Sequence, residues 1–329
     1  MLTPPDGLPA ETVAAVLARE WGLYAAQVSY RPVGWGSHHW EITEAAGDRW
    51  FVTADELENK RVWLHESLDA AFGRLTAALA AATDLRAGGC SFVVAPVPTQ
   101  AGEPLARAGD RFGLAVYPFV DGRSFPWGKF SGDDHRRAIT DLVIAVHTAP
   151  QDLGCRAMTD DFTIPHRDEL EAVMAGIAIP DSGPYARRTA ALVTASARPV
   201  RALLDRYDRL AGLSRPEASP AVLTHGEPHP ANTMLTDAGW LLIDWDTALV
   251  APPERDLWAL DPGDGSVLAR YAEATGVTPV ASALDLYRIR WDLTDLAIDV
   301  SRFRRPHSGT EEDHTSWELL RGLVERISS

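Results

Sequence analysis

The stretch LTHGEPHPANTMLTDAGWLLIDWDTALVAPPERDLW, residues 223–258, decides the fold. Two short apolar runs in it flank residues 237–239, Asp-Ala-Gly, which predicts a β-hairpin closed by a three-residue loop with glycine at a positive φ. Counting outward from the middle of the loop places Asn232 opposite Asp244, unless a bulge slips the register by one residue. An amide oxygen and a carboxylate about 5 Å apart can hold one hard cation such as Mg²⁺.

A second carboxylate, Glu227, precedes the asparagine in a proline-rich loop that cannot be helical, and His225 and His229 flank it. Phosphoryl transfer uses a carboxylate that orients a hydroxyl, together with an asparagine and an aspartate that hold the metal on the nucleotide. The residue types and their order favour this chemistry. The alternative is a surface hairpin with polar ends.

The segments HGEPHPAN, residues 225–232, and IDWD, residues 243–246, resemble the aminoglycoside phosphotransferase family, whose members are relatives of protein kinases. The resemblance implies that Glu227 is at the catalytic-base position and that Asn232 and Asp244 are Mg²⁺ ligands. It also implies ATP or GTP as the phosphoryl donor. The family normally has aspartate where Glu227 stands, so the charge is kept and displaced by one methylene.

The family fold is α+β with two kinase-like lobes, a small antiparallel-sheet N-lobe and a mostly helical C-lobe. We expect the nucleotide-binding lobe at residues 1–117 and the catalytic and substrate-binding lobe at residues 118–329. The segment LAVYPFVDG, residues 114–122, is expected to be the hinge between them. Its backbone would bind the adenine edge, and Tyr117 and Phe119 would pack around the base.

Residues 30–42, YRPVGWGSHHWEI, predict two strands joined by a glycine-rich turn. Gly34 and Gly36 would let the backbone approach a phosphate closely, and Ser37 could add a hydroxyl. The alternative is an ordinary hairpin turn.

The next predicted strand, residues 49–54, is where the family carries a lysine that pairs with the α- and β-phosphates, and Thr53 stands at that position. Lys60 and Lys129 are the only lysines in the chain. Lys60 could return to the phosphates from the loop after the strand. The alternative is that Lys60 lies in solvent, and that the glycine-rich turn and the metal are sufficient to bind the phosphates.

Apolar periodicity and turn residues predict further elements. We expect strands at residues 91–96 and 111–119, and helices at residues 8–23, 62–83, 131–147, 167–177, 185–211 and 284–304, with another in the C-terminal tail. Ser131 is expected to cap its helix, and Asp256 to have a mainly structural role.

Asp292, Asp295 and Asp299 have i, i+3, i+7 spacing, which places them on one face of a helix. Such a stripe repels itself unless positive charge lies against it. One interpretation is an acidic surface that binds an ammonium-bearing antibiotic. The other is structural pairing with Arg288 and Arg302.

The 329-residue chain has a formal net charge of −15. This charge argues against a nucleic-acid partner and suits a cationic small molecule, although it also simply favours solubility. No apolar run approaches a membrane span, and the acidic, proline-containing start is unlike a signal peptide. With only Cys90 and Cys155, a disulfide is not required, and we expect a reduced, cytoplasmic setting without a membrane partner.

The sequence therefore predicts an O-phosphotransferase that modifies a small-molecule hydroxyl, most simply an aminoglycoside-like antibiotic in a resistance enzyme. Two alternatives stay open. One is a metabolic kinase acting on choline, homoserine or a sugar. The other, which the departures at Glu227 and Thr53 allow, is a pseudokinase-like protein that binds nucleotide or antibiotic without turnover.

Overall fold

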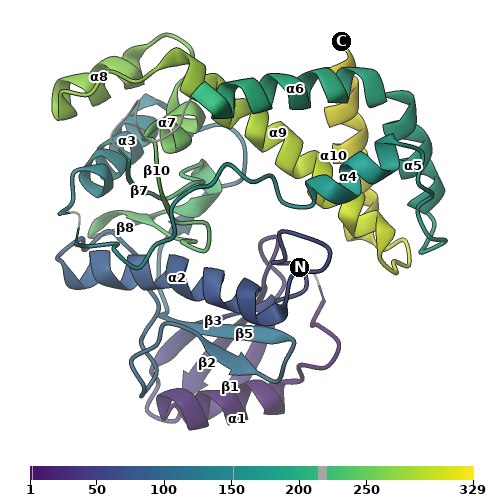
Figure 1. Ribbon diagram of the computed structural model, residues 1–329. Helices are drawn as coiled ribbons and strands as arrows, with labels where there is room; N and C mark the ends of the chain where they lie inside the picture. The colour runs from purple at the N-terminus through teal and green to yellow at the C-terminus, as the bar shows by residue number, and fades with distance from the viewer. Residues whose placement is uncertain (2, 151, 214–220) are drawn as a thin grey trace. The chain divides into compact units, whose positions relative to one another are not determined.

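The computed structural model describes residues 1, 3–150, 152–213 and 221–329. The chain forms two compact units (Figure 1). The first comprises Met1–Lys60, Leu68–Asp160 and Pro220–Val280, and the second comprises Arg61–Ser67, Asp161–Ser219 and Ala281–Ser329. This division differs from the expected lobe boundary after Tyr117, because the hairpin that is predicted to carry the active site falls in the same unit as the N-terminal sheet. The functional lobe boundary stays a prediction.

The first unit contains a five-stranded antiparallel sheet in the order β1-β2-β3-β5-β4. Its strands are β1 (Ala25–Arg31), β2 (His38–Glu44), β3 (Arg49–Glu56), β4 (Ala106–Ala108) and β5 (Phe112–Pro118). Helix α1 (Ala10–Trp21) packs Val13 and Leu17 against Val52 and Ala54 of one sheet face. Because side chains alternate along a strand, Thr53 and Asp55 of β3 lie on the opposite face.

Helix α2 (Leu68–Ala87) covers that opposite face, where Leu75 and Leu79 pack with Ala115 and the partly buried Tyr117. The expected helix at 62–83 is therefore wrong at its start, because residues 62–67 are not helical. Glu66 bonds the backbone N–H of Val62 at 2.7 Å instead.

The remaining elements of the first unit include residues 223–258, the predicted catalytic stretch (Figure 1). They are β6 (Arg123–Ser124), α3 (Asp133–His147), β7 (Val222–Thr224), the 3₁₀ turn η1 (Pro230–Asn232), β8 (Thr233–Thr236), β9 (Gly239–Leu242), β10 (Leu249–Ala251), α7 (Glu254–Leu260) and α8 (Ser266–Thr275). Strands β6, β8 and β9 form one small sheet, and β7 pairs with β10. Trp245, Leu257 and Val143 are buried in this part of the unit.

Two local expectations in this unit are wrong. Residues 91–96 form a single bridge, at Val93 to Leu242, rather than a strand. Pro96 and Pro98 close by have no N–H to donate, which prevents a continuous ladder. Ser131 does not cap α3, whose N-cap is Gly132; its hydroxyl lies 3.1 Å from the ring of His135.

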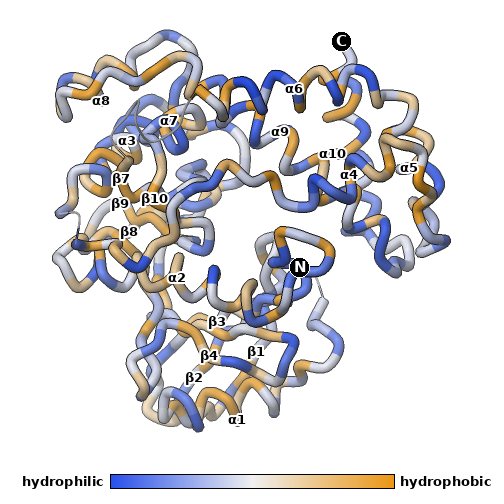
Figure 2. The backbone as a smooth tube through the Cα atoms, viewed as in Figure 1, coloured by the Kyte–Doolittle hydropathy of each residue, from blue (hydrophilic) through white to orange (hydrophobic). Residues whose placement is uncertain are grey.

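The second unit is helical, and its members are α4 (Arg167–Met174), α5 (Ala186–Ala195), α6 (Ala197–Leu213), α9 (Ala281–Arg304) and α10 (Glu311–Ser328). The helix expected at 185–211 is two helices, separated at Ser196. Apolar and polar residues alternate along α9 and α10 (Figure 2), as expected for helices with one buried face.

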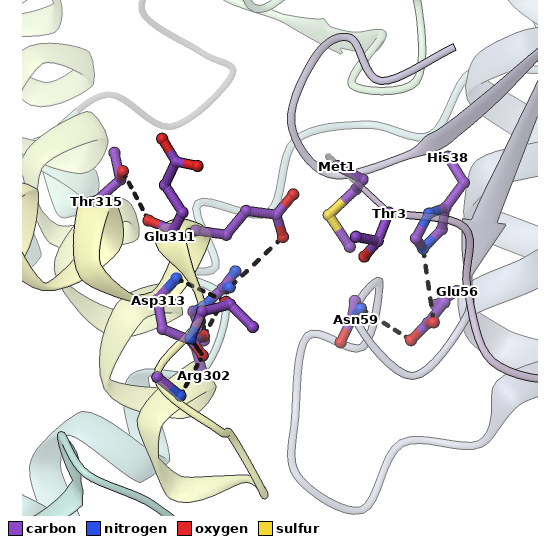
Figure 3. Close-up of polar contacts among 12 residues, drawn as sticks. Met1, Thr3, His38, Glu56, Asn59, Arg302, Glu311, Asp313 and Thr315 are labelled. Carbon is purple, nitrogen blue, oxygen red and sulfur yellow. Dashed lines mark hydrogen bonds and ion pairs between the residues drawn. The ribbon is translucent and has the colours of Figure 1, made fainter. Parts of the chain in front are cut away.

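Polar contacts also hold the second unit together. Buried Glu169 of α4 bonds Ser301 at 2.8 Å and Arg304 at 2.9 Å, and both partners belong to α9. Arg302 pairs with Asp313 of α10 at 2.9 Å (Figure 3). Asp313 also completes a capping box with Thr310. No helix within the described residues is both long and apolar enough to cross a membrane.

Candidate active site

The β8–β9 hairpin has a different register from the expected one. Thr236 pairs with Gly239 across a two-residue turn, so every pair is shifted by one. Asn232 consequently lies opposite Ile243, whose N–H donates to the Asn232 carbonyl at 3.0 Å. The prediction that Asn232 and Asp244 form a regular cross-strand pair is wrong, and the register is shifted by one residue. The Thr236 hydroxyl accepts the N–H of Ala238 at 3.2 Å, which closes the shorter turn.

Asp244 follows shortly after β9 and has an unusual backbone conformation. Its φ of 66° lies in the left-handed region, which aspartate tolerates better than most residues. Such a conformation costs about 1–3 kcal/mol and is typical of functional sites. The Asp244 carboxylate, which reaches solvent, lies near the carboxylates of Asp246 and Glu227.

His225 joins the loop that bears Glu227 to the segment that bears Asp244. The Glu227 N–H donates to His225 Nδ1 at 3.2 Å, so the other ring nitrogen carries the proton. That nitrogen donates to the Ile243 carbonyl at 2.9 Å. The ring is fully buried, and burial lowers the pKa of His225, which favours this neutral form.

Asp256 of α7 holds the same loop from beneath, as expected for a structural residue. Its carboxylate accepts the N–H of His225 at 2.8 Å and of Gly226 at 2.6 Å. His147, at the end of α3, lies 3.0 Å from it. Burial acts to raise the pKa of Asp256, but the hydrogen bond with His147 and the nearby charge of Arg255 together outweigh burial, and the pKa is lowered. Asp256 therefore stays ionised and fixes the backbone before Glu227.

Asn232 is buried, and its amide nitrogen donates to the Glu227 carbonyl at 3.0 Å. This assignment of the amide, which follows from the bonding network, leaves Oδ1 as the atom that can bind a cation. Glu227 is about one-third exposed, and its Oε2 lies 3.5 Å from His229 Nε2. The loop thus fixes the Glu227 backbone while its carboxylate reaches solvent.

These oxygen donors fit Mg²⁺. Although Asp244 reaches solvent, the surrounding protein disfavours its charged form, and the carboxylates of Asp246 and Glu227 act in the same direction, so the pKa of Asp244 is raised and the site favours a bound cation. Among the described residues, no group of three or more acidic, histidine or cysteine side chains could hold a metal alone. Mg²⁺ commonly binds through one or two protein ligands and completes its shell with water and phosphate oxygens. The donor set at Asn232 and Asp244 matches that behaviour.

Lys60 is directed toward these carboxylates. Its amine lies 2.9 Å from Asp55 Oδ1 and 2.6 Å from Asp246 Oδ2. Burial opposes its charge, but the two carboxylates outweigh burial and raise the pKa of Lys60 well above its usual value. In the glycine-rich turn, Ser37 donates to the same Asp55 oxygen at 2.6 Å. Ser37 and Lys60 are therefore connected through one carboxylate.

Gly34 and Gly36 have φ values of 70° and 84°, in the left-handed region that glycine adopts most easily. A Cβ at Gly34 would also meet the ring of His39 at 3.1 Å. The turn thus requires glycine for its backbone conformation.

Tyr117 and Phe119 differ in their surroundings. Burial first, and then Asp244, raises the pKa of Tyr117 well above its usual value, while a hydrogen bond with Thr53 acts in the opposite direction. Tyr117 therefore lies near the site carboxylates, and Thr53 faces it. Phe119 is stacked under the Arg49 guanidinium, 3.6 Å from the ring centroid.

The predicted acidic stripe belongs to α9 of the second unit. Asp292 lies 3.6 Å from Arg326. Burial raises the pKa of Asp299 to about 7, although Arg302 and a bond with Ser316 act to lower it. Asp295 is exposed. Asp292 and Asp299 thus have neighbouring arginines, and an acceptor-binding role for the stripe stays a prediction.

Comparison with known proteins gives this arrangement its context. The sequence pattern of the phosphotransferase enzyme family matches residues 28–292, which include the whole catalytic stretch. The chain belongs to this family. It is therefore a phosphotransferase of small-molecule hydroxyl groups, as expected from the resemblance to aminoglycoside phosphotransferases.

The phosphotransferase also resembles individual proteins. It is 31% identical to protein StrN of Streptomyces griseus over 247 residues, which cover 72% of each chain. Its fold matches a spectinomycin phosphotransferase solved with ADP and spectinomycin, at a TM-score of 0.68 and 16% identity over 98% of both chains. An amicoumacin kinase solved with AMP-PNP and Ca²⁺ matches at a TM-score of 0.55 and 14% identity, over 98% of this chain and 93% of the other. These structures confirm the two-lobed, kinase-like α+β fold.

Two carboxylates near Lys60 have no role among the sequence-based expectations. Asp55 lies just beyond the predicted strand at residues 49–54, whereas β3 continues to Glu56. Asp246 belongs to the IDWD segment, in which only Asp244 has an expected role. An aspartate directly after an apolar strand segment is a signal that could have identified Asp55, since a charged residue buried in a sheet needs a partner of opposite charge.

Proposed function

We propose that this phosphotransferase moves the γ-phosphoryl group of ATP or GTP to a hydroxyl of an aminoglycoside-like antibiotic, with Mg²⁺ on the nucleotide. The observation that carries the proposal is the hydrogen-bonded loop that places Glu227 beside Asn232 and Asp244. His225 and Asp256 fix that loop through bonds to its backbone.

In the proposed reaction, the acceptor oxygen forms a bond to the γ-phosphorus while the bond between that phosphorus and the β–γ bridging oxygen breaks. Glu227 orients the hydroxyl and receives its proton, and the nucleoside diphosphate leaves. Asn232 and Asp244 would hold Mg²⁺, which would neutralise charge on the phosphates. Catalysis is then positioning and charge neutralisation, without a covalent enzyme intermediate.

The other proposed contacts follow the same geometry. Gly34, Gly36 and Ser37 would approach the phosphates from the turn between β1 and β2. Tyr117 and Phe119, at the end of β5, would pack around the nucleobase. Gly34 and Gly36 are held by their left-handed backbone conformation, and Tyr117 is held by its packing against Leu75 and Leu79.

Two observations support an antibiotic acceptor. Solved structures with this fold contain spectinomycin or amicoumacin. The formal net charge of −15 suits an acceptor with ammonium groups. On this proposal, Asp292, Asp295 and Asp299 form an acidic surface of the second unit available to such an acceptor.

The test is incubation of the purified chain with Mg²⁺, ATP or GTP, and a panel of acceptors, read by mass spectrometry for an added phosphate. The panel contains spectinomycin, several aminoglycosides, choline, ethanolamine, homoserine and simple sugars, and Asp244→Asn is the matched inactive control. Phosphate on an antibiotic supports the proposal. Phosphate only on a metabolite would replace it with a metabolic kinase, and nucleotide binding without any transfer would indicate a binding protein.

A further inference from the structure

Lys60 is held by Asp55, a carboxylate of the strand on which the family carries its phosphate-binding lysine. We propose that Asp55 is a positioning residue that holds Lys60 at the phosphate-binding site. Lys60 then binds the phosphates in place of a lysine at position 53. This inference rests on the proposed function, because it concerns how the phosphates of the donor nucleotide are bound.

The strand geometry places Asp55 where such a pair is useful. Thr53 and Asp55 are two residues apart in β3 and lie on the same sheet face, the one that faces Tyr117 and α2. The side chain of Asp55 is only 4% exposed, and Lys60 is 22% exposed. A buried carboxylate requires a partner, and Lys60 at 2.9 Å is the cation that supplies it. The pair is therefore built into the sheet face beside the site.

The backbone at Lys60 is fixed, which distinguishes it from a mobile surface lysine. After β3 the chain turns, with the Lys60 N–H donating to the Leu57 carbonyl at 3.2 Å. Arg74 of α2 donates to the Lys60 carbonyl at 2.7 Å. Hydrogen bonds thus hold both the N–H and the carbonyl of Lys60, so that its side chain is the part that can move.

Asp246 and Asp55 share the Lys60 amine, but they have different environments. Asp246 is 22% exposed and follows Asp244 closely in the chain. Asp55 is buried and also accepts the Ser37 hydroxyl. A lysine ammonium has three donors, so it can keep its bond to Asp55 while phosphate oxygens take the place of Asp246. We infer that nucleotide competes with Asp246 for Lys60, whereas Asp55 retains it and links it to the glycine-rich turn.

Amine labelling tests the position of Lys60 without turnover. The chain has only two lysines, so a brief reaction with an amine-acylating reagent, followed by peptide mass spectrometry, compares Lys60 with Lys129 in one sample. We expect ADP with Mg²⁺ to slow labelling of Lys60 at least about tenfold and to leave Lys129 unchanged. Equal rates with and without bound nucleotide would overturn the inference.

Variants test the role of Asp55. Nucleotide affinity is measured by calorimetry, without acceptor, after thermal unfolding has shown that each variant is folded. Asp55→Asn is expected to weaken nucleotide binding about tenfold, which is about 1.4 kcal/mol, and to speed labelling of Lys60. The control Asp69→Asn removes an exposed carboxylate that pairs with Arg107, and we expect it to change neither readout.

A relocated lysine provides the rescue. Lys60→Met should weaken nucleotide binding, and the double change Thr53→Lys with Lys60→Met should restore it, because a lysine at 53 extends from the same sheet face. If the wild type binds no nucleotide, the proposed function fails. If it binds nucleotide and Asp55→Asn binds equally well with unchanged Lys60 labelling, only the inference about Asp55 fails.

Discussion

At the scale of the residue, Glu227 is positioned by bonds to its backbone rather than to its carboxylate. Its N–H is bonded to His225 and its carbonyl to Asn232. The side chain can therefore be changed while the loop keeps its shape. This makes the carboxylate a clean target for mutation.

Glu227→Gln is expected to lower kcat about 10²-fold or more with little change in KM, because the amide cannot accept the hydroxyl proton. Glu227→Asp keeps the charge and should retain more activity than the amide. Steady-state kinetics with saturating nucleotide measure both. Equal activity of Gln and Glu at this position would remove the carboxylate from the chemistry.

Asp244 allows a variant that separates charge from backbone conformation. Asparagine adopts a positive φ readily, so Asp244→Asn should keep the wild-type melting temperature and lower turnover about 10²-fold or more. Asp244→Ala should lose the same activity and about 1 kcal/mol of stability in addition, because alanine is strained there. Near-normal transfer by folded Asp244→Asn would exclude this carboxylate from the site.

At the scale of the element, α7 supports the catalytic loop through Asp256. Replacing this ionised, buried carboxylate by Asn leaves one N–H of the loop facing an amide N–H, and it leaves His147 without its charged partner. We expect Asp256→Asn to lower the free energy of unfolding by about 3 kcal/mol and kcat with it. Urea unfolding measures the first, with exposed Glu273→Gln on α8 as control. A fully stable and active Asp256→Asn would show that α7 does not position the loop.

Helix α9 makes stability depend on pH through Asp299. Its pKa is about 7 in the folded chain and about 3.9 when unfolded. Between these values the folded state binds more protons, so the free energy of unfolding falls as pH rises from about 4 to 7 and then levels. Asp299→Asn should remove this loss and be more stable than wild type at pH 8 by about 1–2 kcal/mol, since solvent screens part of the effect. The exposed Asp295→Asn is the control, and parallel pH profiles of Asp299→Asn and wild type would contradict the expectation.

The elements also mark where sequence reasoning succeeds. Strand β2 and the helices α3 and α9 follow from apolar periodicity, because each has a buried face. The hairpin register at Asn232 could not be predicted in this way. Thr236 and Gly239 close a two-residue turn through side-chain and backbone hydrogen bonds that the order of residues does not reveal. The helix start at Leu68 was likewise hidden, because Leu64 fits the apolar period yet is exposed.

At the scale of the whole molecule, the candidate catalytic residues come from a short contiguous segment that the sequence identifies, and the sequence also offered Lys60 as a candidate cation, but it did not indicate which residues hold Lys60. Glu227, Asn232 and Asp244 lie within one motif. The contacts of Lys60 join residues 55, 60 and 246, and only the folded chain brings these together. The same applies to the pairing of Asp256 with His147.

The most direct test of the central claim is the stoichiometry of transfer, followed by phosphorus NMR in one reaction with Mg²⁺, nucleoside triphosphate and the acceptor identified from the panel. We predict that nucleoside diphosphate and a phosphorylated alcohol form in equal amounts with the wild type, and that both signals are lost together in Asp244→Asn. Release of inorganic phosphate in place of the phosphorylated alcohol, or undiminished transfer by Asp244→Asn, would contradict the account.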